Sequence, residues 1–593
     1  MPLFVEELTK SVLESGLLRD EKGRYVLDST LSRFAIPMSL QDSLMARLDR
    51  LASVRLVAQI GAAIGREFSY ALLHTVARLP EQELQTALAR LVASGLVFQR
   101  GAPPEAVYIF KHALVQDTAH GSLLRGSRQQ LHVQIAEALE TRSPDLMDTQ
   151  PELFAQHYAE AGLVEKAVAC WGRAGHRSVA RAAIVEAAAQ FQKGLDQLSL
   201  LPDDPERQRQ ELEFCSSLSA ALRAIKGQAA PETGRAYARA RELWEQLGSP
   251  SEFVQIPYGQ SRYHAHRCEF DLAHRLDEDL LHLSRQRNDT AGLVLGHLSS
   301  GVNLMFVGRF AASRSHLEKA LALYDPISQC SLVHLAGVHP HIFSQAYLGN
   351  VLFCLGFPDQ ALARSNANIT EASRLAHPPS LAGGLAIGAR TLSLVGDYAA
   401  LNEWVNQLTA LATEQSFPHW SAQGPIYRGW VKVKNGDVTE GMSLLRSGSN
   451  AYRTGGAELL VPHYIALLAA ANEIAGQVEE SLALFDDALQ LVERTRDRWF
   501  AAELNRLKGQ LLLRQGRYEA AEELYLKALG IAHEQDAKLW ELRTAVSLAR
   551  LWSEKRKRSE ARDLLAPIYG WFTEGFDTPD LKDAKALLDE LAS

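Results

Sequence analysis

A turn that recurs every 40 residues is the feature that most constrains what this chain can fold into. The turns begin at Gly356, Gly396, Gly436, Gly476 and Gly516, and the same step forward reaches Arg556. Backward from Gly356 the spacing is 48 residues, to Gly308, and a further 40 residues lead to Cys268. A glycine that ends one helix in a left-handed conformation, followed at once by the next helix, makes a helical hairpin. The period therefore predicts a stack of helical hairpins.

Two columns of small residues flank these turns. Seven residues before each turn stand Ser261, Gly301, Gly349, Ala389, Gly429, Ala469, Gly509 and Ala549, and five residues after it stand Ala273, Ser313, Ala361, Leu401, Gly441, Ser481, Ala521 and Ala561. All but Leu401 are Gly, Ala or Ser, which is what two closely crossing antiparallel helices need at their contact. The unit resembles a tetratricopeptide repeat, whose usual period is about 34 residues, and HEAT-type stacking is the alternative.

The fold class that follows is all-α, with a tetratricopeptide-like α-solenoid (superhelix) of period 40 over residues 141–593. An amphipathic helix over 581–591 is expected to cap its open end, because the last apolar face would otherwise meet water. Such superhelices bind partners along the inner surface, which the first helix of each hairpin lines.

Residues 36–140 do not follow the repeat and predict a winged-helix-like domain. Apolar residues at helical spacing indicate helices over 39–51, 54–64 and 81–93, and two β-prone runs around a Gly/Pro turn indicate a hairpin over 95–110. From Met38 to Glu140 there are ten Lys and Arg against nine Asp and Glu, too little positive charge for a major-groove reader. DNA binding is therefore not the function we expect from this domain. A winged-helix transcription regulator with a tetratricopeptide sensor tail is the alternative function.

Net charge, cysteine spacing and the polarity of the charge-free segments exclude several function classes. The 593 residues carry a net charge of −8, so bulk attraction to nucleic acid or anionic membranes is not available. Five cysteines without a CxxC pair indicate a reducing compartment, and we expect a cytoplasmic protein. The segments 291–308 and 326–358 lack Asp, Glu, Lys and Arg but are too polar to cross a bilayer, which predicts buried helices.

Several runs resemble the C-terminal part of large bacterial signalling ATPases. They are residues 2–8 (PLFVEEL), 110–117 (FKHALVQD), 131–139 (LHVQIAEAL) and 569–581 (YGWFTEGFDTPDL). The fuller resemblance is to multidomain proteins with a class III adenylate or guanylate cyclase domain, a STAND-type ATPase and a tetratricopeptide tail, and it covers nearly the whole chain. It implies that residues 1–35 are the edge of an ATPase module. His120 departs from the resemblance, because relatives usually carry an aromatic residue there.

The nucleotide-binding signature of that family does not occur in this sequence. GxxxxGK[ST] is absent, and the dipeptide Gly-Lys occurs nowhere, so there is no lysine-bearing phosphate loop of the Walker type. We therefore expect a sensor or scaffold with no catalytic residue and no cofactor, and a nucleotide-binding module supplied in trans. A truncated ATPase or adenylate cyclase is the remaining alternative.

The inner surface of the solenoid is the predicted binding site. Six residues before successive turns, and on the same helix faces, stand the candidate groove residues Asn350, Arg390, Trp430, Glu473, Arg506 and Gln510. Amide and guanidinium groups around one aromatic anchor suit recognition of a protein, a peptide or a small-molecule inducer. The alternative is that Trp430 belongs to the core and the polar residues are merely solvated. The eight-residue insertion between Gly308 and Gly356 is a second candidate pocket.

Two groups of histidines offer ligands of the kind that zinc prefers. They are His264, His266 and Cys268, and His334, His339 and His341. On a helix His264 and His266 face different sides, and residues at helix ends and interfaces explain both groups. We therefore assign no metal ligand from the sequence.

Overall fold

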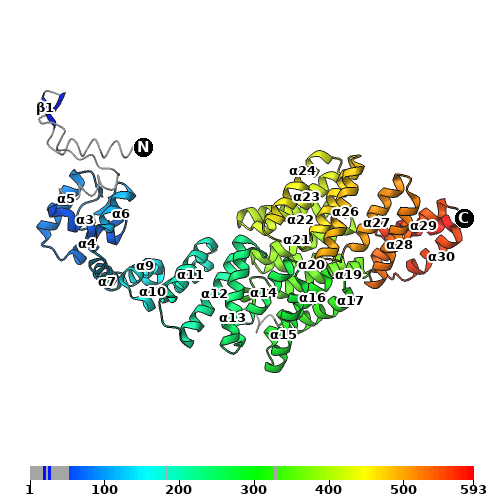
Figure 1. Ribbon diagram of the computed structural model, residues 1–593, viewed down its shortest axis with the longest axis horizontal. Helices are drawn as coiled ribbons and strands as arrows, with labels where there is room; N and C mark the ends of the chain where they lie inside the picture. Colours follow the sequence, from blue (N-terminus) through cyan, green and yellow to red (C-terminus); the bar gives the residue numbers. More distant parts are fainter. Residues whose placement is uncertain (1–17, 22–23, 28–51, 182, 326–331, 593) are drawn as a thin grey trace. The chain divides into compact units, whose positions relative to one another are not determined.

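The computed structural model describes residues 18–21, 24–27, 52–181, 183–325 and 332–592. It is an all-α, tetratricopeptide-like solenoid preceded by a smaller unit that contains short strands (Figure 1). Packing divides the chain into two compact units, residues 1–203 and 204–593. The predicted domain boundary between residues 140 and 141 stays a prediction.

The first unit is a set of short helices and strands followed by longer helices. Its elements are β1 (Leu18–Glu21), β2 (Arg24–Leu27), α3 (Ala52–Ile64), β3 (Glu67–Ser69), α4 (Tyr70–Ala77), α5 (Glu81–Ala93), β4 (Val97–Arg100), β5 (Val107–Phe110), α6 (Ala113–Gly121), α7 (Arg125–Arg142), α8 (Leu146–Thr149), α9 (Pro151–Ala161), α10 (Val164–Ala180) and α11 (Ile184–Leu198). The helices predicted over 54–64 and 81–93 are confirmed, and the one predicted over 39–51 lies outside the described residues.

A three-stranded sheet holds this unit's small core. The predicted hairpin is confirmed, because β4 and β5 pair antiparallel with Val97 opposite Phe110. The sequence missed β3, a strand of three residues that pairs with the other edge of β5 and places Phe68 opposite Tyr108. The rings of Phe68 and Tyr108 stack with their centroids 5.7 Å apart. The sequence also missed α4, whose eight residues are too few to show a helical period.

The second unit is a regular succession of antiparallel helices. They are α12 (Pro205–Lys226), α13 (Pro231–Gln246), the 3₁₀ turn η2 (Ser251–Phe253), α14 (Gln255–His266), α15 (Phe270–Arg287), α16 (Thr290–Phe306), α17 (Phe310–Leu323), α18 (Leu332–Ala336), α19 (Pro340–Cys354), α20 (Pro358–Arg374), α21 (Pro378–Val395), α22 (Tyr398–Glu414), α23 (Pro418–Lys434), α24 (Val438–Thr454), α25 (Val461–Ile474), α26 (Val478–Thr495), α27 (Ala501–Arg514), α28 (Tyr518–Glu534), α29 (Lys538–Glu554), α30 (Arg558–Gly570) and α31 (Pro579–Ala592).

Left-handed residues end the first helix of the hairpins, as the 40-residue period predicts. The glycines from Gly308 to Gly516 that mark the turns have φ between 75° and 94°. Cys268 and Arg556, which occupy the same place at the two ends of the series, adopt φ of 59° and 62° without being glycine. The turn therefore keeps its geometry where the residue type changes.

The two columns of small residues meet where the paired helices cross. A Cβ on Gly429 would lie 2.6 Å from the carbonyl oxygen of Gly441, so α23 and α24 cross with their backbones nearly touching. The Ser313 hydroxyl donates to the carbonyl oxygen of Gly301 at 2.6 Å, and the Ser481 hydroxyl donates to that of Ala469 at 2.8 Å. Each contact joins residues 12 apart, one from each column, and confirms the predicted hairpin.

The superhelix is wound tightly enough that distant repeats touch. The carbonyl oxygen of His266, at the end of α14, accepts hydrogen bonds from the backbone N–H of Glu458 and Leu459. One period later the carbonyl oxygen of Phe306, at the end of α16, accepts in the same way from the N–H of 498 and 499. These bonds span 192 residues and help to enclose the interior, where buried apolar side chains from Ala229 to Leu591 form one cluster.

The last helix closes the open end of the solenoid. The predicted helix over 581–591 is confirmed as α31, which packs on α29 and α30 with Leu581, Leu587 and Leu591 buried. The segment 291–308 is also a buried helix, α16, as expected. Among the described helices, none combines the length and the apolar character needed to cross a bilayer.

Candidate ligand pocket

An internal pocket opens between the first helices of five consecutive hairpins in the second unit. These helices are α14, α16, α19, α21 and α23, with residues from α12, α24 and the loops beside them completing the wall. About 630 Å³ of space is free of protein atoms, counting the open mouth. The lining residues are Arg223, Gln228, Tyr258, Arg262, His266, Leu298, Val302, Val338, Phe343, Tyr347, Ile387, Arg390, His419, Trp420, Gln423, Tyr452, Leu459 and Leu460.

The charge of this pocket is one-sided. Arg223, Arg262 and Arg390 contribute three guanidinium groups, and no Asp or Glu occurs among the described lining residues. Burial lowers the pKa of His419 to about 4 and that of His266 well below its usual value, so both imidazoles are neutral near pH 7. The wall therefore carries three positive charges on an otherwise aromatic and aliphatic surface.

Arg390, on α21, is the most deeply buried of these cations, with 1% of its surface exposed. Its Nη1 donates to Asn350 Oδ1 at 3.2 Å, while its Nε has no hydrogen-bond partner within the described part of the chain. The guanidinium carbon lies 5.6 Å from the ring centroids of both Phe306 and Trp499. Aromatic faces and one amide oxygen hold this charge, and the ion pairs found among the described residues do not include it.

Arg262, on α14, reaches the pocket through a buried polar network. Its Nη1 donates to Asn303 Oδ1 at 2.8 Å, and Asn303 Nδ2 donates in turn to Asp277 Oδ2 at 2.8 Å. The Ser261 hydroxyl donates to the other oxygen of Asp277 at 2.6 Å. Burial raises the pKa of Asp277 to about 7, against the hydrogen bonds that favour its ionised form. The network fixes Arg262 through a neutral amide, so the guanidinium is not directly paired with the carboxylate.

Arg223, near the end of α12, completes the set of cations. Its Nη2 donates to the carbonyl oxygen of Ala336 at 2.6 Å, beside the end of α18. This contact joins the first helix of the second unit to the insertion between Gly308 and Gly356. Residues 326–331 of that insertion lie outside the described residues, and Val338 on its other side lines the pocket.

Of the six predicted groove residues, the structure places two, Arg390 and Asn350, at the pocket. Arg390 lines the pocket, and Asn350 lies behind it with its Nδ2 donating to Thr391 Oγ1 at 2.8 Å. Trp430 is buried under the ammonium group of Lys434, 4.6 Å from its ring centroid. Trp430 thus belongs to the buried apolar cluster and does not line the pocket around Arg390.

The other three predicted residues lie farther along the superhelix and pair locally. Glu473 forms an ion pair with Arg514 at 2.7 Å. Arg506 Nε lies 2.7 Å from Glu503 Oε2, and its Nη1 donates to Gln510 Oε1 at 3.3 Å. None of them lines the pocket around Arg390. A binding role for these positions stays a prediction.

The column of positions six residues before each turn reaches Arg262, Val302 and Arg390 of the pocket wall, but not its other residues. Arg262 stands six residues before Cys268, so the column that contains Arg390 reaches it when extended back to the first turn. Arg223, His419 and Trp420 lie outside that column, and only the winding of the superhelix brings them to the pocket.

The histidines that the sequence offered as metal ligands have other partners. His264 Nδ1 lies 2.5 Å from a carboxylate oxygen of Glu269, and His266 Nδ1 lies 2.7 Å from the carbonyl oxygen of Arg262. His339 Nε2 lies 3.1 Å from the hydroxyl of Tyr324. Neither group converges on a common point among its described residues.

Comparison with known proteins identifies the repeats. The family model described as a tetratricopeptide repeat matches residues 462–532, which hold most of the two hairpins α25–α26 and α27–α28. A protein of Rhizobium meliloti (strain 1021), described as uncharacterized, is 25% identical over 551 residues, which are 91% of this chain and 52% of the relative. The chain thus spans about half the length of this relative.

Solved structures resemble the chain only loosely. A Rap protein complexed with competence and sporulation factor is 13% identical, with a TM-score of 0.45 over 63% of this chain and 99% of that one. A STAND protein with a tetratricopeptide repeat sensor from Pyrococcus horikoshii is 11% identical, with a TM-score of 0.29 over 94% of this chain and 68% of that one. No ligand or partner is inferred from either structure.

Proposed function

We propose that this chain is the sensor and scaffold portion of a bacterial signal-transduction ATPase and that its superhelix binds a ligand with a carboxylate on an apolar body. The observation that carries the proposal is the pocket around Arg390, which has three guanidinium groups and no Asp or Glu among its described lining residues. The ligand would occupy the pocket and bias a nucleotide-binding module supplied in trans.

The charge of the pocket supports an anionic ligand. A buried guanidinium with no directly paired carboxylate costs free energy, because its lost hydration is only partly offset by more distant groups such as the Asp497 carboxyl. A ligand carboxylate would recover that cost through charge-assisted hydrogen bonds, and Arg presents donors in the fork geometry that carboxylates accept. Arg390 Nε is free to donate, since Nη1 alone is used by Asn350 among the described residues.

The rest of the wall supports an apolar body on that ligand. Aromatic rings line the pocket, those of Tyr258, Phe343, Tyr347, Trp420 and Tyr452. Small-molecule sites are typically lined by apolar and aromatic side chains with a few fixed polar groups, and the wall around Arg390 has that composition. A small aromatic acid and the C-terminal residues of a peptide share this chemistry.

The connection to a signalling ATPase rests on sequence runs. Residues 2–8, 110–117 and 569–581 resemble the corresponding segments of STAND-type proteins, and the Gly-Lys dipeptide of a phosphate loop is absent. The order of α3, β3, α4, α5, β4 and β5 suits a winged-helix-like domain within residues 36–140. In this proposal that domain carries the signal from the superhelix at 141–593 to the ATPase, whose edge is residues 1–35.

Thermal unfolding of the full chain with paired ligands tests the proposal. The probes are phenylacetate and indole-3-acetate, and short peptides with an aromatic C-terminal residue, each compared with its neutral amide. We expect carboxylates of one kind to raise the melting temperature and their amides to leave it unchanged; the responding kind identifies the source of the carboxylate. Equal shifts for acids and amides, or tight Mg²⁺-dependent binding of ATP to this chain alone, would contradict the proposal.

A further inference from the structure

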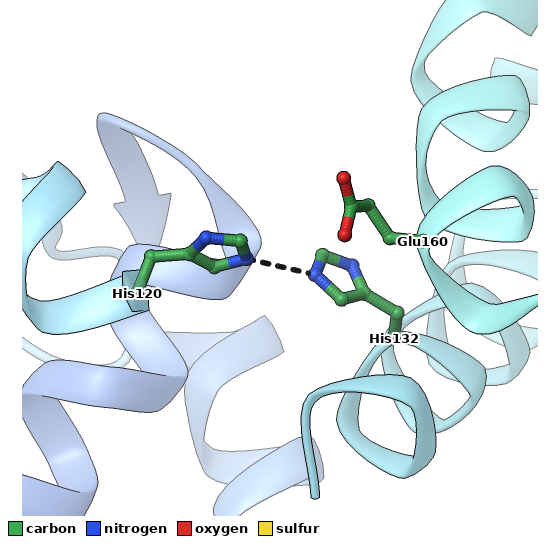
Figure 2. Close-up of side chains that lie close together, drawn as sticks. All are labelled: His120, His132 and Glu160. Atoms are coloured by element: carbon green, nitrogen blue, oxygen red, sulfur yellow. Dashed lines mark hydrogen bonds between the residues drawn. The ribbon is translucent and has the colours of Figure 1, made fainter. Parts of the chain in front are cut away.

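Two histidines and a glutamate from three helices of the first unit converge at one point, and a third histidine contacts one of them from the other side. His120 is on α6, His132 is on α7, and His157 and Glu160 are on α9. Figure 2 shows the rings of His120 and His132 facing each other across a hydrogen bond, with the Glu160 carboxylate beside the ring of His132. One nitrogen of each ring and one oxygen of Glu160 all lie within 4.8 Å of one another.

The distance between the two rings suits a shared metal ion. His120 Nε2 lies 3.1 Å from His132 Nε2. Two imidazole nitrogens bound to Zn²⁺ at 2.0–2.1 Å with a tetrahedral angle would lie about 3.4 Å apart. The separation of the two nitrogens is therefore within a few tenths of an ångström of that between two imidazole ligands of one ion, and binding would require both nitrogens to be unprotonated and turned toward the ion.

His157 supplies the support that a metal-bound imidazole needs. His132 Nδ1 lies 2.9 Å from His157 Nδ1, and both residues are 3% exposed. If His132 donates from Nδ1 to His157, its Nε2 carries a lone pair toward His120 and Glu160. Ligating histidines almost always make such a hydrogen bond through the other ring nitrogen, which fixes the tautomer.

Glu160 is placed to complete the set from the solvent side. Its side chain is 42% exposed and its Oε2 lies 3.7 Å from Arg128 Nε, a loose ion pair that leaves the carboxylate able to turn.

We propose that His120, His132 and Glu160 bind a Zn²⁺ ion, with His157 orienting His132 and a fourth position open to water. Two imidazoles and a carboxylate with an open position are a known ligand set for zinc. The ion would link α6, α7 and α9, so metal binding would stabilise the first unit. This site is separate from the pocket around Arg390, and its test does not depend on the proposed function.

Cobalt titration of the chelator-treated full chain tests the site. Co²⁺ in a tetrahedral site absorbs visible light, and competition by Zn²⁺ then gives the zinc affinity. We expect one ion per chain, displaced by one equivalent of Zn²⁺, and a rise in melting temperature when Zn²⁺ is added. Absence of saturable binding, or an octahedral Co²⁺ spectrum alone, would overturn the proposal.

Variants separate the site from other histidines of the chain. His120→Phe, which introduces the aromatic residue expected from the resemblance, and Glu160→Gln should each weaken Zn²⁺ binding by about 100-fold or more, beyond the ~10–100-fold typical of an orienting residue. His157→Phe should weaken binding by about 10–100-fold while keeping the stoichiometry. His74→Ala, an exposed histidine in the same unit, is the control and should bind as the wild type. Unchanged affinity in His120→Phe and Glu160→Gln would overturn the assignment even if metal binds.

Discussion

Two arginines of the superhelix, the buried Arg390 and the largely buried Arg543, whose side chain is 16% exposed, differ in what surrounds their charge. Arg543 on α29 donates from Nε and Nη2 to the two oxygens of Asp580 at 2.7 and 2.8 Å, and its Nη1 lies 3.3 Å from Glu503 Oε1. Arg390 on α21 donates to one amide oxygen among the described residues, Asn350 Oδ1, at 3.2 Å. Both guanidinium groups pack against two aromatic rings.

The difference indicates different roles for the same residue type. Arg543 also donates to the carbonyl oxygen of Leu394, so it links α29 to α21 and α31. Its charge is already balanced by acidic side chains of the chain itself. Arg390 faces a pocket and keeps an unused donor. A largely buried charge with its partners in place serves the fold, whereas one without a direct ion pair is what the proposed ligand site requires.

The largest expected effect is at the paired arginine. Arg543→Met leaves Asp580 without its bidentate partner and removes one of the cations beside Glu503, and breaking a buried ion pair costs about 3–5 kcal/mol. Urea denaturation should show a loss of that size, with carboxylate binding at the Arg390 pocket unchanged under conditions where the variant is folded. A loss below ~1 kcal/mol would mean that the two arginines are not different in kind.

Arg390→Met should act in the opposite direction. Removing a buried charge that lacks an ion-pair partner and filling its space with an apolar side chain should raise the free energy of unfolding by about 1–3 kcal/mol in the absence of ligand. The same denaturation experiment measures it. Destabilisation by a similar amount would show that Arg390 is structural, like Arg543.

The pH dependence of stability tests whether Arg390 has a charged neighbour in Asp497. This carboxyl group accepts a hydrogen bond from the Leu460 N–H at 2.8 Å, beside the pocket wall, and burial raises its pKa to about 7, although Arg390 opposes the shift. The folded state therefore takes up a proton near pH 7 that the unfolded state takes up only near its ordinary value of 3.8. The contribution of Asp497 to stability should therefore rise as the pH falls from 7 to 6.

The change attributable to Asp497 over that pH unit is about 1 kcal/mol. Asp497→Asn removes the ionisable group, so the change in the free energy of unfolding from pH 7 to pH 6 should be less favourable in the variant than in the wild type by that amount. Identical pH dependence in the two proteins would show that Asp497 is ionised in the folded protein at both pH values. Arg390 would then have a nearby counter-charge.

The smallest effect is expected at an exposed arginine. Arg550, also on α29, pairs with Asp583 at the surface, where its side chain is 51% exposed. Exposed ion pairs contribute about 0–1 kcal/mol, so Arg550→Met should change stability by less than ~1 kcal/mol and leave ligand binding intact. A larger loss would show that arginine content as such, rather than burial and pairing, governs stability here.

Local features of the fold were predictable from the sequence because they repeat. The turn at Gly436 and the crossing of Gly429 with Gly441 follow from spacing alone, since both lie within one hairpin. The bond between His266 and Glu458 does not, because it depends on small rotations that accumulate over 192 residues. Sequence columns show which residue faces inward but not how tightly the inner face closes.

The same limit explains what could be foreseen of the sites. Arg390 stands in a column that the period defines, so its place on the inner face was predictable, whereas the lack of an ion pair around it was not. His120, His132 and Glu160 come from three helices at unequal spacing. No local sequence motif predicts that these three side chains lie close together. Only the packing of α6, α7 and α9 brings them into contact.

The most direct test of the central claim is calorimetric titration of the full chain with the carboxylate that most raises its melting temperature. We expect saturable 1:1 binding to the wild type and to Arg550→Met, with affinity reduced at least ~10-fold in Arg390→Met, since charge-assisted hydrogen bonds contribute about 1.5–3 kcal/mol. Equal affinity in all three proteins would contradict it.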